Sequence, residues 1–347
     1  MTLKNMARPT IKDLAEAANV SVSTVNRILR GAGEVRGPTM ERVCQAAEEI
    51  GFYGLGTIKS AISANRETYR FGILLQQRGR VFYDELGSAI MQAAKAFPDA
   101  TVAVELEFMR DLLPESTADQ IRDMGQRCDA ISLVAPEHPT IVDAINEVTS
   151  NNVPVIALIS PILSNGNVGY VGLDNWKVGR TAAWAFDRLT RRSGKIATFV
   201  GHHRFKNQDQ NESGFRSYFR EHKSDLNLLE AETTFESSSV AHELTEKLIK
   251  EHEDLTGVFI SGGGITGVLS ALRESGRAKD LVVVGYELMA PTRAALLDGT
   301  MDLVISHPIQ KLAENLIGTL IRARRAGSEA GTQRTTLQFE MFTSENI

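Results

Sequence analysis

Apolar residues in the first fifty positions recur every three or four residues, which is the spacing of an amphipathic helix. The pattern predicts three short helices. The first covers 11–19, the second starts after Ser21, a good N-cap, and ends at Gly31, and the third opens at Gly37 and ends at Gly51. Valines and serines separate the first two, because β-branched residues and serine disfavour helix interiors. Two helices joined by a tight polar turn are typical of a helix-turn-helix.

From residue 69 onward, short apolar runs alternate with amphipathic helical stretches. Strands are predicted at 69–75, 101–108, 129–135, 153–159, 168–174, 195–201, 255–261, 281–287, 301–307 and 335–342. Helices are predicted between them at 84–96, 116–127, 139–150, 176–191, 214–222, 240–252, 267–275, 290–297 and 308–325. Continuous apolar strands that alternate with helices indicate parallel sheets covered on both faces, so we expect an α/β fold with two doubly wound parallel-sheet lobes.

The segment "YGLGTIKSAISANRET" at 53–68 connects the helical head to the α/β region. Two glycines precede Thr57–Ala64, which is long enough for one or two helical turns and is marginal alone in water. We therefore expect this segment to need a partner to become ordered.

Charge is distributed unevenly along the chain. The 347 residues carry a formal net charge of −5, which by itself argues against a nucleic-acid partner. Residues 1–70, however, hold ten lysines and arginines against seven acidic residues, and the remainder is acidic. A mildly basic head on an acidic body favours a small module that faces a polyanion, although random scatter of charge is the alternative.

Cysteine and apolar content exclude several classes of protein. Cys44 and Cys128 are the two cysteines, and neither belongs to a C-x-x-C or His/Cys cluster with zinc-site spacing. No apolar run has the form of a signal peptide or the length of a membrane span. We expect a cytoplasmic protein with no metal, no cofactor and no membrane partner.

The second predicted helix has one polar face. Three of its apolar residues, Val25, Ile28 and Leu29, are expected to face the core. The side chains that then face outward are Val22, Ser23, Asn26, Arg27 and Arg30. Arg pairs bidentately with guanine, and Ser or Asn reaches base edges or phosphates, so this face has the chemistry to enter a major groove. A small helical cap with a solvated polar face is the alternative.

The stretch "TIKDLAEAANVSVSTVNRILRG", followed by "VRGPTMERVCQAAEEIGF", resembles the head of the lactose-repressor (LacI) family of bacterial transcription regulators. The α/β remainder resembles that family's sugar-receptor-like core, which is related to periplasmic binding proteins. The resemblance implies a helix-turn-helix DNA-binding domain at 8–53, a hinge at 54–69 and a two-lobed effector-binding and dimerisation core at 70–347. The lobes would cover about 70–172 with 308–332, and about 173–306 with 333–347.

The resemblance also implies roles for residues of the head. Val22, Ser23 and Arg27 occupy the positions that read bases in the family. The positions at which the family touches phosphates are Thr10, Ser21, Thr24, Asn26 and Arg30. The implied partner is double-stranded operator DNA.

The hinge is where this chain departs from the family. Thr57–Ala64 falls where the family has a helix that folds upon DNA, pairs with its dimer mate and inserts an apolar wedge into the minor groove. Lys59 is a candidate DNA contact there, and Ile62, or Ala61 if the register slips by one, is the candidate wedge. The family's usual Pro-Asn start is replaced by "GLGT", whose glycines make the helix costlier to order.

One reading head cannot select an operator alone. A bidentate Arg–guanine contact discriminates by roughly 1–3 kcal/mol, which is too little to find one site among millions. A homodimer doubles the readout and predicts a pseudopalindromic operator. No heptad repeat follows the last predicted strand, which favours a dimer over a tetramer.

A glycine-rich motif offers an enzyme as the alternative. Gly262, Gly264 and Gly267 form G-x-G-x-x-G after a predicted strand and before a predicted helix, and Glu287 follows about twenty residues on. That pattern suits a nicotinamide-dependent oxidoreductase. The motif falls late in the fold, however, and neither an oxidoreductase residue set nor a G-x-S-x-G nucleophile elbow accompanies it. The resemblance gives the turn another use, because in ribose-receptor-like cores it lines the sugar cleft. We therefore expect a regulator, with no catalytic residues.

Polar and aromatic side chains follow the predicted strands, where ligands bind in open α/β sheets. The effector-binding candidates are Phe82, Tyr83, Glu137, His138, Ser160, His202, Asn211, Phe235, Ser261, Glu287 and His307. As a group they are expected to converge on one cleft. The family often has an Arg where this chain has Asn211, which favours a carbohydrate or polyol over a phospho-sugar unless Arg78, Arg80 or Arg204 compensates.

We expect a homodimeric regulator, a repressor rather than an activator, whose small-molecule effector changes the angle between the lobes. Such coupling between two sites is typically about 1–3 kcal/mol and is reciprocal. The chain should cross between lobes near Gly172–Asp174, His307 and Gln333. A DNA-binding dimer whose core binds no small molecule is a third possibility.

Overall fold

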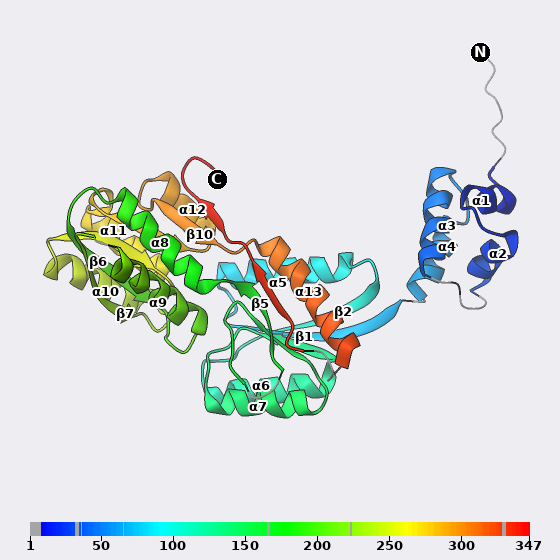
Figure 1. Ribbon diagram of the computed structural model, residues 1–347, viewed down its shortest axis with the longest axis horizontal. Helices are drawn as coiled ribbons and strands as arrows, with labels where there is room; N and C mark the ends of the chain where they lie inside the picture. The colour runs from blue at the N-terminus through cyan, green and yellow to red at the C-terminus, as the bar shows by residue number, and fades with distance from the viewer. Residues whose placement is uncertain are drawn as a thin grey trace, which may run out of the picture. The chain divides into compact units, whose positions relative to one another are not determined.

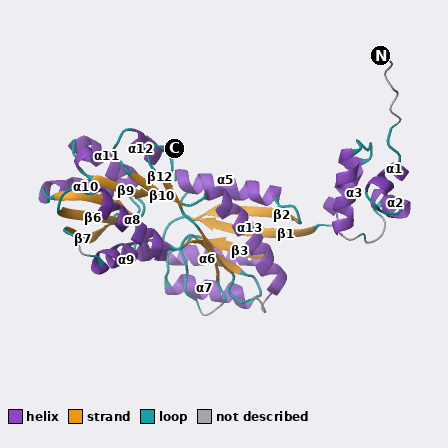
Figure 2. Cartoon of the chain, turned by 45° about the horizontal axis from the view of Figure 1, so that its top comes forward, coloured by secondary structure: helices purple, strands orange, loops and turns teal. Residues whose placement is uncertain are grey.

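The computed structural model describes residues 8–31, 35, 37–64, 66–164, 167–222, 224–327 and 331–347. The chain divides into two compact units, each with its own core. The first comprises the chain to Thr68 with Phe97–Thr101, and the second comprises Tyr69–Ala96 with Val102–Ile347. Figure 1 and Figure 2 show a helical first unit and an α/β second unit. Among the described helices, none combines the length and apolar character that crossing a bilayer requires.

The described residues of the first unit form four helices: α1 (Ile11–Ala17), α2 (Val22–Arg30), α3 (Gly37–Glu49) and α4 (Leu55–Ala64). Fully buried Leu14, Val25, Val43 and Ile58 bring one residue from each helix into a shared core. The predicted end signals of α2 are confirmed, because Ser21 accepts a hydrogen bond from the Thr24 amide and Gly31 caps the helix in the left-handed conformation.

The turn between α1 and α2 uses a residue that the sequence pattern did not single out. Asn19 has φ = +51°, a left-handed conformation that Asn tolerates better than most residues. The chain thereby reverses between Ala18, which ends α1, and Ser21, which caps α2.

Helix α4 begins two residues before the predicted Thr57–Ala64 segment and packs against α2 and α3. Ile58 is fully buried in the core of the head, and Lys59 forms an ion pair with Glu48 of α3. The partner that this short helix requires is therefore present within the head itself. Ile62 lies on α4, but its side chain falls outside the described residues, so its expected role as a wedge is not placed.

Replacing Gly56 with alanine is expected to stabilise α4. Gly56 is exposed, and a Cβ built on it meets no atom within 4 Å, so the gain in helix propensity of roughly 0.5–1 kcal/mol comes without a clash. Hydrogen exchange of the 55–64 amides in the full chain should slow by about two- to fivefold. Gly54→Ala is the control, because its Cβ would lie 2.6 Å from the Phe52 ring, and it should speed exchange instead.

The second unit contains two lobes, each with a six-stranded sheet. The strands are β1 (Glu67–Leu75), β2 (Ala100–Phe108), β3 (Ala130–Leu133), β4 (Val155–Leu158), β5 (Gly169–Leu173), β6 (Gly194–Val200), β7 (Leu226–Thr233), β8 (Leu255–Ile260), β9 (Val282–Tyr286), β10 (Leu303–Ser306), β11 (Arg334–Leu337) and β12 (Glu340–Phe342). The first sheet has the order β11-β5-β4-β3-β1-β2, and the second has the order β12-β10-β9-β8-β6-β7. Strand β12 runs antiparallel to β10, and the pairs β1–β3, β3–β4, β4–β5, β5–β11, β6–β7, β6–β8, β8–β9 and β9–β10 are parallel.

Helices cover both faces of each sheet, as continuous apolar strands require. In the first lobe, α5 (Val81–Ala96) and α13 (Ile309–Ala326) lie on one face, and α6 (Pro114–Arg127) and α7 (Pro139–Ser150) lie on the other (Figure 1). In the second lobe, α8 (Asn175–Leu189) and α9 (Lys206–Glu221) pack on one face. The opposite face is covered by α10 (Ser238–Glu251), α11 (Ile265–Ser275) and α12 (Ala290–Leu297). The predicted α/β class with two doubly wound lobes is confirmed.

Two details of the predicted lobes are wrong. The run at 335–342 is two strands, because β11 pairs with β5 of the first lobe and β12 pairs with β10 of the second. The last crossover therefore lies between Leu337 and Glu340, and the expected lobe boundary near Gln333 is displaced by about one strand. Strand β7 was not predicted, because it is a half-buried edge strand whose glutamates interrupt the apolar pattern.

Candidate functional site

Helix α2 presents an exposed polar face. Val22 is 43% exposed, and Thr10, Ser21, Ser23, Arg27 and Arg30 are exposed as well, while Thr24 and Asn26 are partly exposed. Within the described part of the chain, Arg27 and Arg30 make no ion pair. Both guanidinium groups are therefore available to an external partner.

The start of α2 is held by a small hydroxyl network. Ser21 Oγ lies 2.7 Å from Ser23 Oγ and 2.8 Å from Thr24 Oγ1, and it accepts the Thr24 amide at 3.2 Å. Thr10 similarly caps α1 through a reciprocal capping box with Asp13. The Thr10 hydroxyl donates to Asp13 at 2.7 Å, whereas the exposed hydroxyls at the start of α2 lie at a helix N-terminus, where a phosphate can accept hydrogen bonds.

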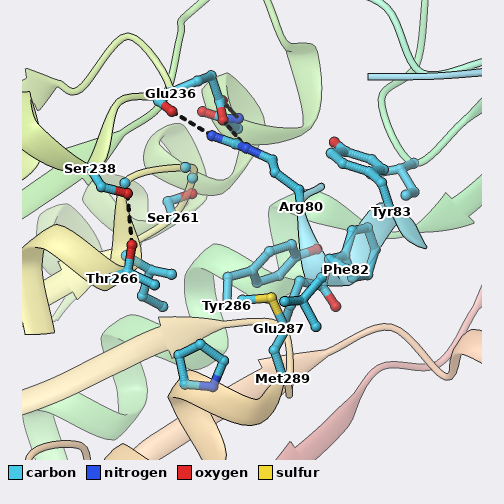
Figure 3. Close-up of a pocket in the computed structure, with 18 of the residues that line it drawn as sticks. Arg80, Phe82, Tyr83, Glu236, Ser238, Ser261, Thr266, Tyr286, Glu287 and Met289 are labelled. Atoms are coloured by element: carbon cyan, nitrogen blue, oxygen red, sulfur yellow. Dashed lines mark hydrogen bonds and ion pairs between the residues drawn. The ribbon is translucent and has the colours of Figure 1, made fainter. Parts of the chain in front are cut away.

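A cavity of about 290 Å³ lies between the two lobes, at the carboxyl ends of their strands. Its walls come from the loop after β1, the glycine-rich turn after β8 and the loop after β9 (Figure 3). The lining residues are Gly79, Arg80, Val81, Phe82, Tyr83, Ile159, Asn207, Gln208, Glu236, Ser238, Ser261, Gly262, Gly263, Gly264, Ile265, Thr266, Tyr286, Glu287, Met289 and Pro291. Aromatic rings with a few convergent polar groups are typical of a small-molecule site, and this volume is at the small end of the usual range.

Glu236 is the centre of a polar network in one wall. Arg80, from the other lobe, donates through Nη1 to the Glu236 carboxylate and through Nη2 to its carbonyl oxygen. Gln208 Nε2 donates to Glu236 Oε1 at 2.8 Å, and Gln208 Oε1 accepts from the Gly201 amide at 2.6 Å. The Glu236 side chain is only 1% exposed, so a charged carboxylate there requires these partners.

Glu287 is held in a second network at the opposite wall. His307 Nδ1 lies 2.6 Å from Glu287 Oε1, while the His307 amide and Ser306 Oγ both donate to Oε2 at 3.1 Å. Both carboxylate oxygens thus have partners behind the cavity, which fixes the position of the Glu287 carboxylate in the wall. His307 is 2% exposed and supports the wall without lining the cavity.

Backbone strain concentrates around this cavity. Ile159, Phe235, Glu236 and Glu287 all have φ between +51° and +69°, a region that non-glycine residues rarely adopt. For β-branched Ile159 the conformation is a true outlier. Each such residue costs on the order of 1–3 kcal/mol and persists where its surroundings over-determine it, as happens at ligand clamps.

Contacts across the cavity hold the lobes together. Besides the Arg80–Glu236 pair, the Glu137 amide donates to the Arg204 carbonyl oxygen at 2.7 Å, and the Asn207 amide lies 3.4 Å from Ser160 Oγ. Each contact joins a loop at the strand ends of one lobe to the other lobe. The structure therefore represents a closed arrangement of the core.

Four of the predicted effector contacts line the cavity: Phe82, Tyr83, Ser261 and Glu287. The others do not, which corrects the expectation of one converging ring. Those seven are Glu137, His138, Ser160, His202, Asn211, Phe235 and His307.

The physical reasons for these seven differ. Buried Asn211 is engaged behind Ser261, with the amide oriented so that it accepts from Ser261 Oγ. His138 caps α7 by accepting from the Thr140 amide. Ser160 and Glu137 take part in the contacts between lobes. Phe235 is 64% exposed, and its ring centroid lies 6.4 Å from that of His202, outside the cavity lining.

Sequence reasoning missed Glu236, Gln208 and Asn207, and it considered Arg80 only as a possible substitute cation. Glu236 follows β7, the strand that was not predicted, so no pattern pointed to it. Gln208 lies on the first turn of α9, which begins eight residues before the predicted start of that helix. The sequence could have suggested Arg80 as a cavity residue, because it directly follows Gly79 in the loop after β1.

Two tyrosines in the cavity lining have raised pKa values. Burial raises the pKa of Tyr286 well above its usual value, and the charge of Glu287 adds to the shift. Burial, followed by the charge of Glu236, also raises the pKa of Tyr83. Both phenols therefore stay protonated at neutral pH, and they can donate hydrogen bonds to a ligand.

Other residues of the chain, Glu236 and Ser238, pack closely against the glycine-rich turn. A Cβ on Gly201 or Gly263 would collide with the Glu236 carboxylate, and one on Gly267 would collide with the Ser238 carbonyl of α10. The glycines thus make room for a carboxylate and for close packing of α10 on α11. A dinucleotide pyrophosphate would meet Glu236 here, so the oxidoreductase alternative is not favoured.

One surface group has the residue types of a metal site. Ligand atoms of His242, Glu246 and Glu274 lie within 4.8 Å of one another on α10 and α11. His242 Nε2 is 3.1 Å from Glu274 Oε2, so two members already satisfy each other, and both glutamates are exposed. Solvated acidic groups of this kind are common without a bound ion, and none of the three residues lines the cavity.

Comparison with known proteins agrees with this two-part organisation. A model of bacterial regulatory proteins of the lacI family matches residues 10–54, and a periplasmic binding protein domain model matches residues 71–326. Catabolite control protein A of Priestia megaterium is 24% identical over 294 residues, covering 80% of this chain and 82% of that protein. The ribose operon repressor of Halalkalibacterium halodurans is 24% identical over 283 residues, covering 80% of each chain.

Solved structures of sugar-binding proteins resemble about four-fifths of this chain. GanP, a glucose-galactose binding protein from Geobacillus stearothermophilus, superimposes with a TM-score of 0.73 at 18% identity, covering 81% of this chain and 99% of that one. An identity this low establishes the fold and not the ligand. Together, the head, the two-lobed core and the full-length relatives show that this chain belongs to the LacI family of bacterial DNA-binding transcription regulators.

Proposed function

We propose that this chain acts in the cytoplasm as a homodimeric repressor whose operator affinity is set by a small carbohydrate or polyol. The observation that carries the proposal is the closed cavity between the lobes, which combines aromatic rings with hydrogen-bonding groups from both. Its volume of about 290 Å³ suits a small ligand. Relatives named as repressors, among them the ribose operon repressor, support the direction of control.

Operator recognition is assigned to the exposed face of α2. Val22, Ser23 and Arg27 would read base edges, and the capped hydroxyls at the starts of α1 and α2, with Arg30, would hold phosphates. Two such heads related by two-fold symmetry would read a pseudopalindromic site. Lys59 has a weaker claim as a DNA contact, because it is paired with Glu48 in this structure.

Effector control would act through the angle between the lobes. A ligand that contacts Phe82 from one lobe and Ser261 from the other binds the closed form best, and it can shift the equilibrium only by that difference in affinity. The cavity is not filled by side chains, which favours this proposal over a dimer that binds no small molecule.

A mobility-shift assay with the upstream region of the protein's own operon tests the proposal. We expect specific binding that changes when one member of a panel of neutral sugars and polyols is added. Absence of specific binding at low salt would overturn the operator assignment. Specific binding without any thermal shift from the whole panel would instead support the dimer that lacks an effector.

A further inference from the structure

The glycine-rich turn before α11 is a place where a phosphate is expected to bind. The turn leads directly into the N-terminus of the eleven-residue α11, and a helix N-terminus favours negative charge. In this chain the Glu236 carboxylate already lies against that turn. Its oxygens pack so closely on Gly201 and Gly263 that no side chain fits at either position.

Two side-chain hydrogen-bond donors and a left-handed backbone conformation hold Glu236 in this position. Arg80 and Gln208 each donate to the carboxylate, and the residue is held at φ = +61° next to Phe235 at φ = +51°. The strain and the 1% side-chain exposure show that the surrounding structure places the carboxylate here. A mobile surface glutamate would have none of these features.

No basic side chain among the described residues that line the cavity is free to pair with an anionic ligand. Arg80 is the single basic residue among those that line the cavity, and its guanidinium is engaged by Glu236. Glu287 adds a second carboxylate. Arg78 stacks over the Phe108 ring at 5.2 Å, and Arg204 is outside the lining, so neither compensates.

We propose that Glu236 is a built-in anion that occupies the phosphate position of the effector cavity and makes the protein reject phosphorylated ligands. The inference rests on the proposed role of the cavity as the effector site. An incoming phosphate would be placed beside a buried carboxylate, and like charges at such distances in a poorly hydrated site repel strongly. An uncharged polyol does not face this barrier, because its hydroxyls can donate to the carboxylates.

The test uses inorganic phosphate as the probe, so it does not depend on knowing the effector. Glu236→Gly removes both charge and bulk, and glycine tolerates the left-handed backbone there. Glu236→Gln removes the charge but keeps the bulk. Glu230→Gln is the matched control, because the Glu230 side chain is 99% exposed on β7. Isothermal titration and thermal shift are run on the full chain at constant ionic strength.

We expect wild type and Glu230→Gln to show no saturable phosphate binding over the concentrations tested. Glu236→Gly should bind phosphate saturably, with an affinity at least about tenfold above the upper limit set by the wild type. Glu236→Gln should gain less, because its side chain still fills the turn. The gain should vanish in Arg80→Met/Glu236→Gly, which places the bound phosphate at this site. Circular dichroism of each variant confirms that it is folded.

Saturable phosphate binding by wild type that equals that of Glu236→Gly would overturn the proposal, as would a folded Glu236→Gly that gains nothing. If Glu236→Gly fails to fold, two other measurements test the proposal: phosphate binding by Glu236→Gln, and the affinities of the wild type for D-ribose and for D-ribose 5-phosphate. Tighter binding of D-ribose 5-phosphate by the wild type would overturn the proposal. If Glu236→Gly gains phosphate binding but the protein binds no sugar, the result supports the role of Glu236 and counts against the proposed sugar effector. Failure of the Glu236 proposal can therefore be distinguished from failure of the proposed function.

Discussion

Arg27→Ala is expected to abolish specific operator binding while leaving the head folded. Arg27 is exposed on α2, opposite the buried Val25 and Ile28, and it makes no ion pair among the described residues. Truncating it therefore removes no packing contact from the core. A bidentate Arg–guanine pair discriminates by about 1–3 kcal/mol, and the proposed dimer would lose two such pairs, so affinity for the operator should fall roughly 30-fold to 10⁴-fold.

Fluorescence anisotropy with an operator duplex and a scrambled duplex measures this loss. Arg27→Ala should weaken binding to the operator far more than binding to the scrambled DNA, because base contacts carry the sequence information. Arg42→Ala is the control, since Arg42 is an exposed cation on α3 outside the proposed reading face. An equal loss on both duplexes would instead make Arg27 a phosphate contact.

The head was predictable because its signals are local. Ser21 as N-cap and Gly31 as C-cap are readable from neighbouring residues, and the structure confirms both. The packing of α4 was not predictable, because it depends on Ile58 reaching a core formed by the other three helices. The same distinction explains β11 and β12, which form one apolar run in sequence but pair with different sheets.

The cavity was predictable only where a residue directly follows a recognised strand. Ser261 and Glu287 come straight after β8 and β9, and both line the cavity. The Arg80–Glu236 pair joins positions 156 residues apart on different lobes, so its formation depends on lobe closure and not on local pattern. The sequence shows that Asn211 stands where the family often has an Arg. It does not show that Glu236 neutralises Arg80, because that ion pair forms only when the lobes are closed.

The Arg80–Glu236 pair gives the core an internal contribution to closure, and Arg80→Met is expected to remove it. Glu236 would then be left nearly fully buried with Gln208 as its remaining side-chain donor. Leaving one member of a buried pair uncompensated costs about 3–5 kcal/mol, and opening the lobes lowers this cost by hydrating the carboxylate. We therefore expect the variant to populate an open core, with most of the penalty appearing as lost closure and less as unfolding.

Small-angle scattering and urea unfolding separate these effects. Arg80→Met should increase the radius of gyration of the ligand-free protein and lower its effector affinity, because the closed form that binds ligand is less populated. Arg80→Met/Glu236→Gln carries no buried charge at this position and should recover much of the closure, which gives a coupling energy from a double-mutant cycle. Equal opening in the single and double variants would mean that the Glu137–Arg204 and Asn207–Ser160 contacts, and not the ion pair, hold the lobes together.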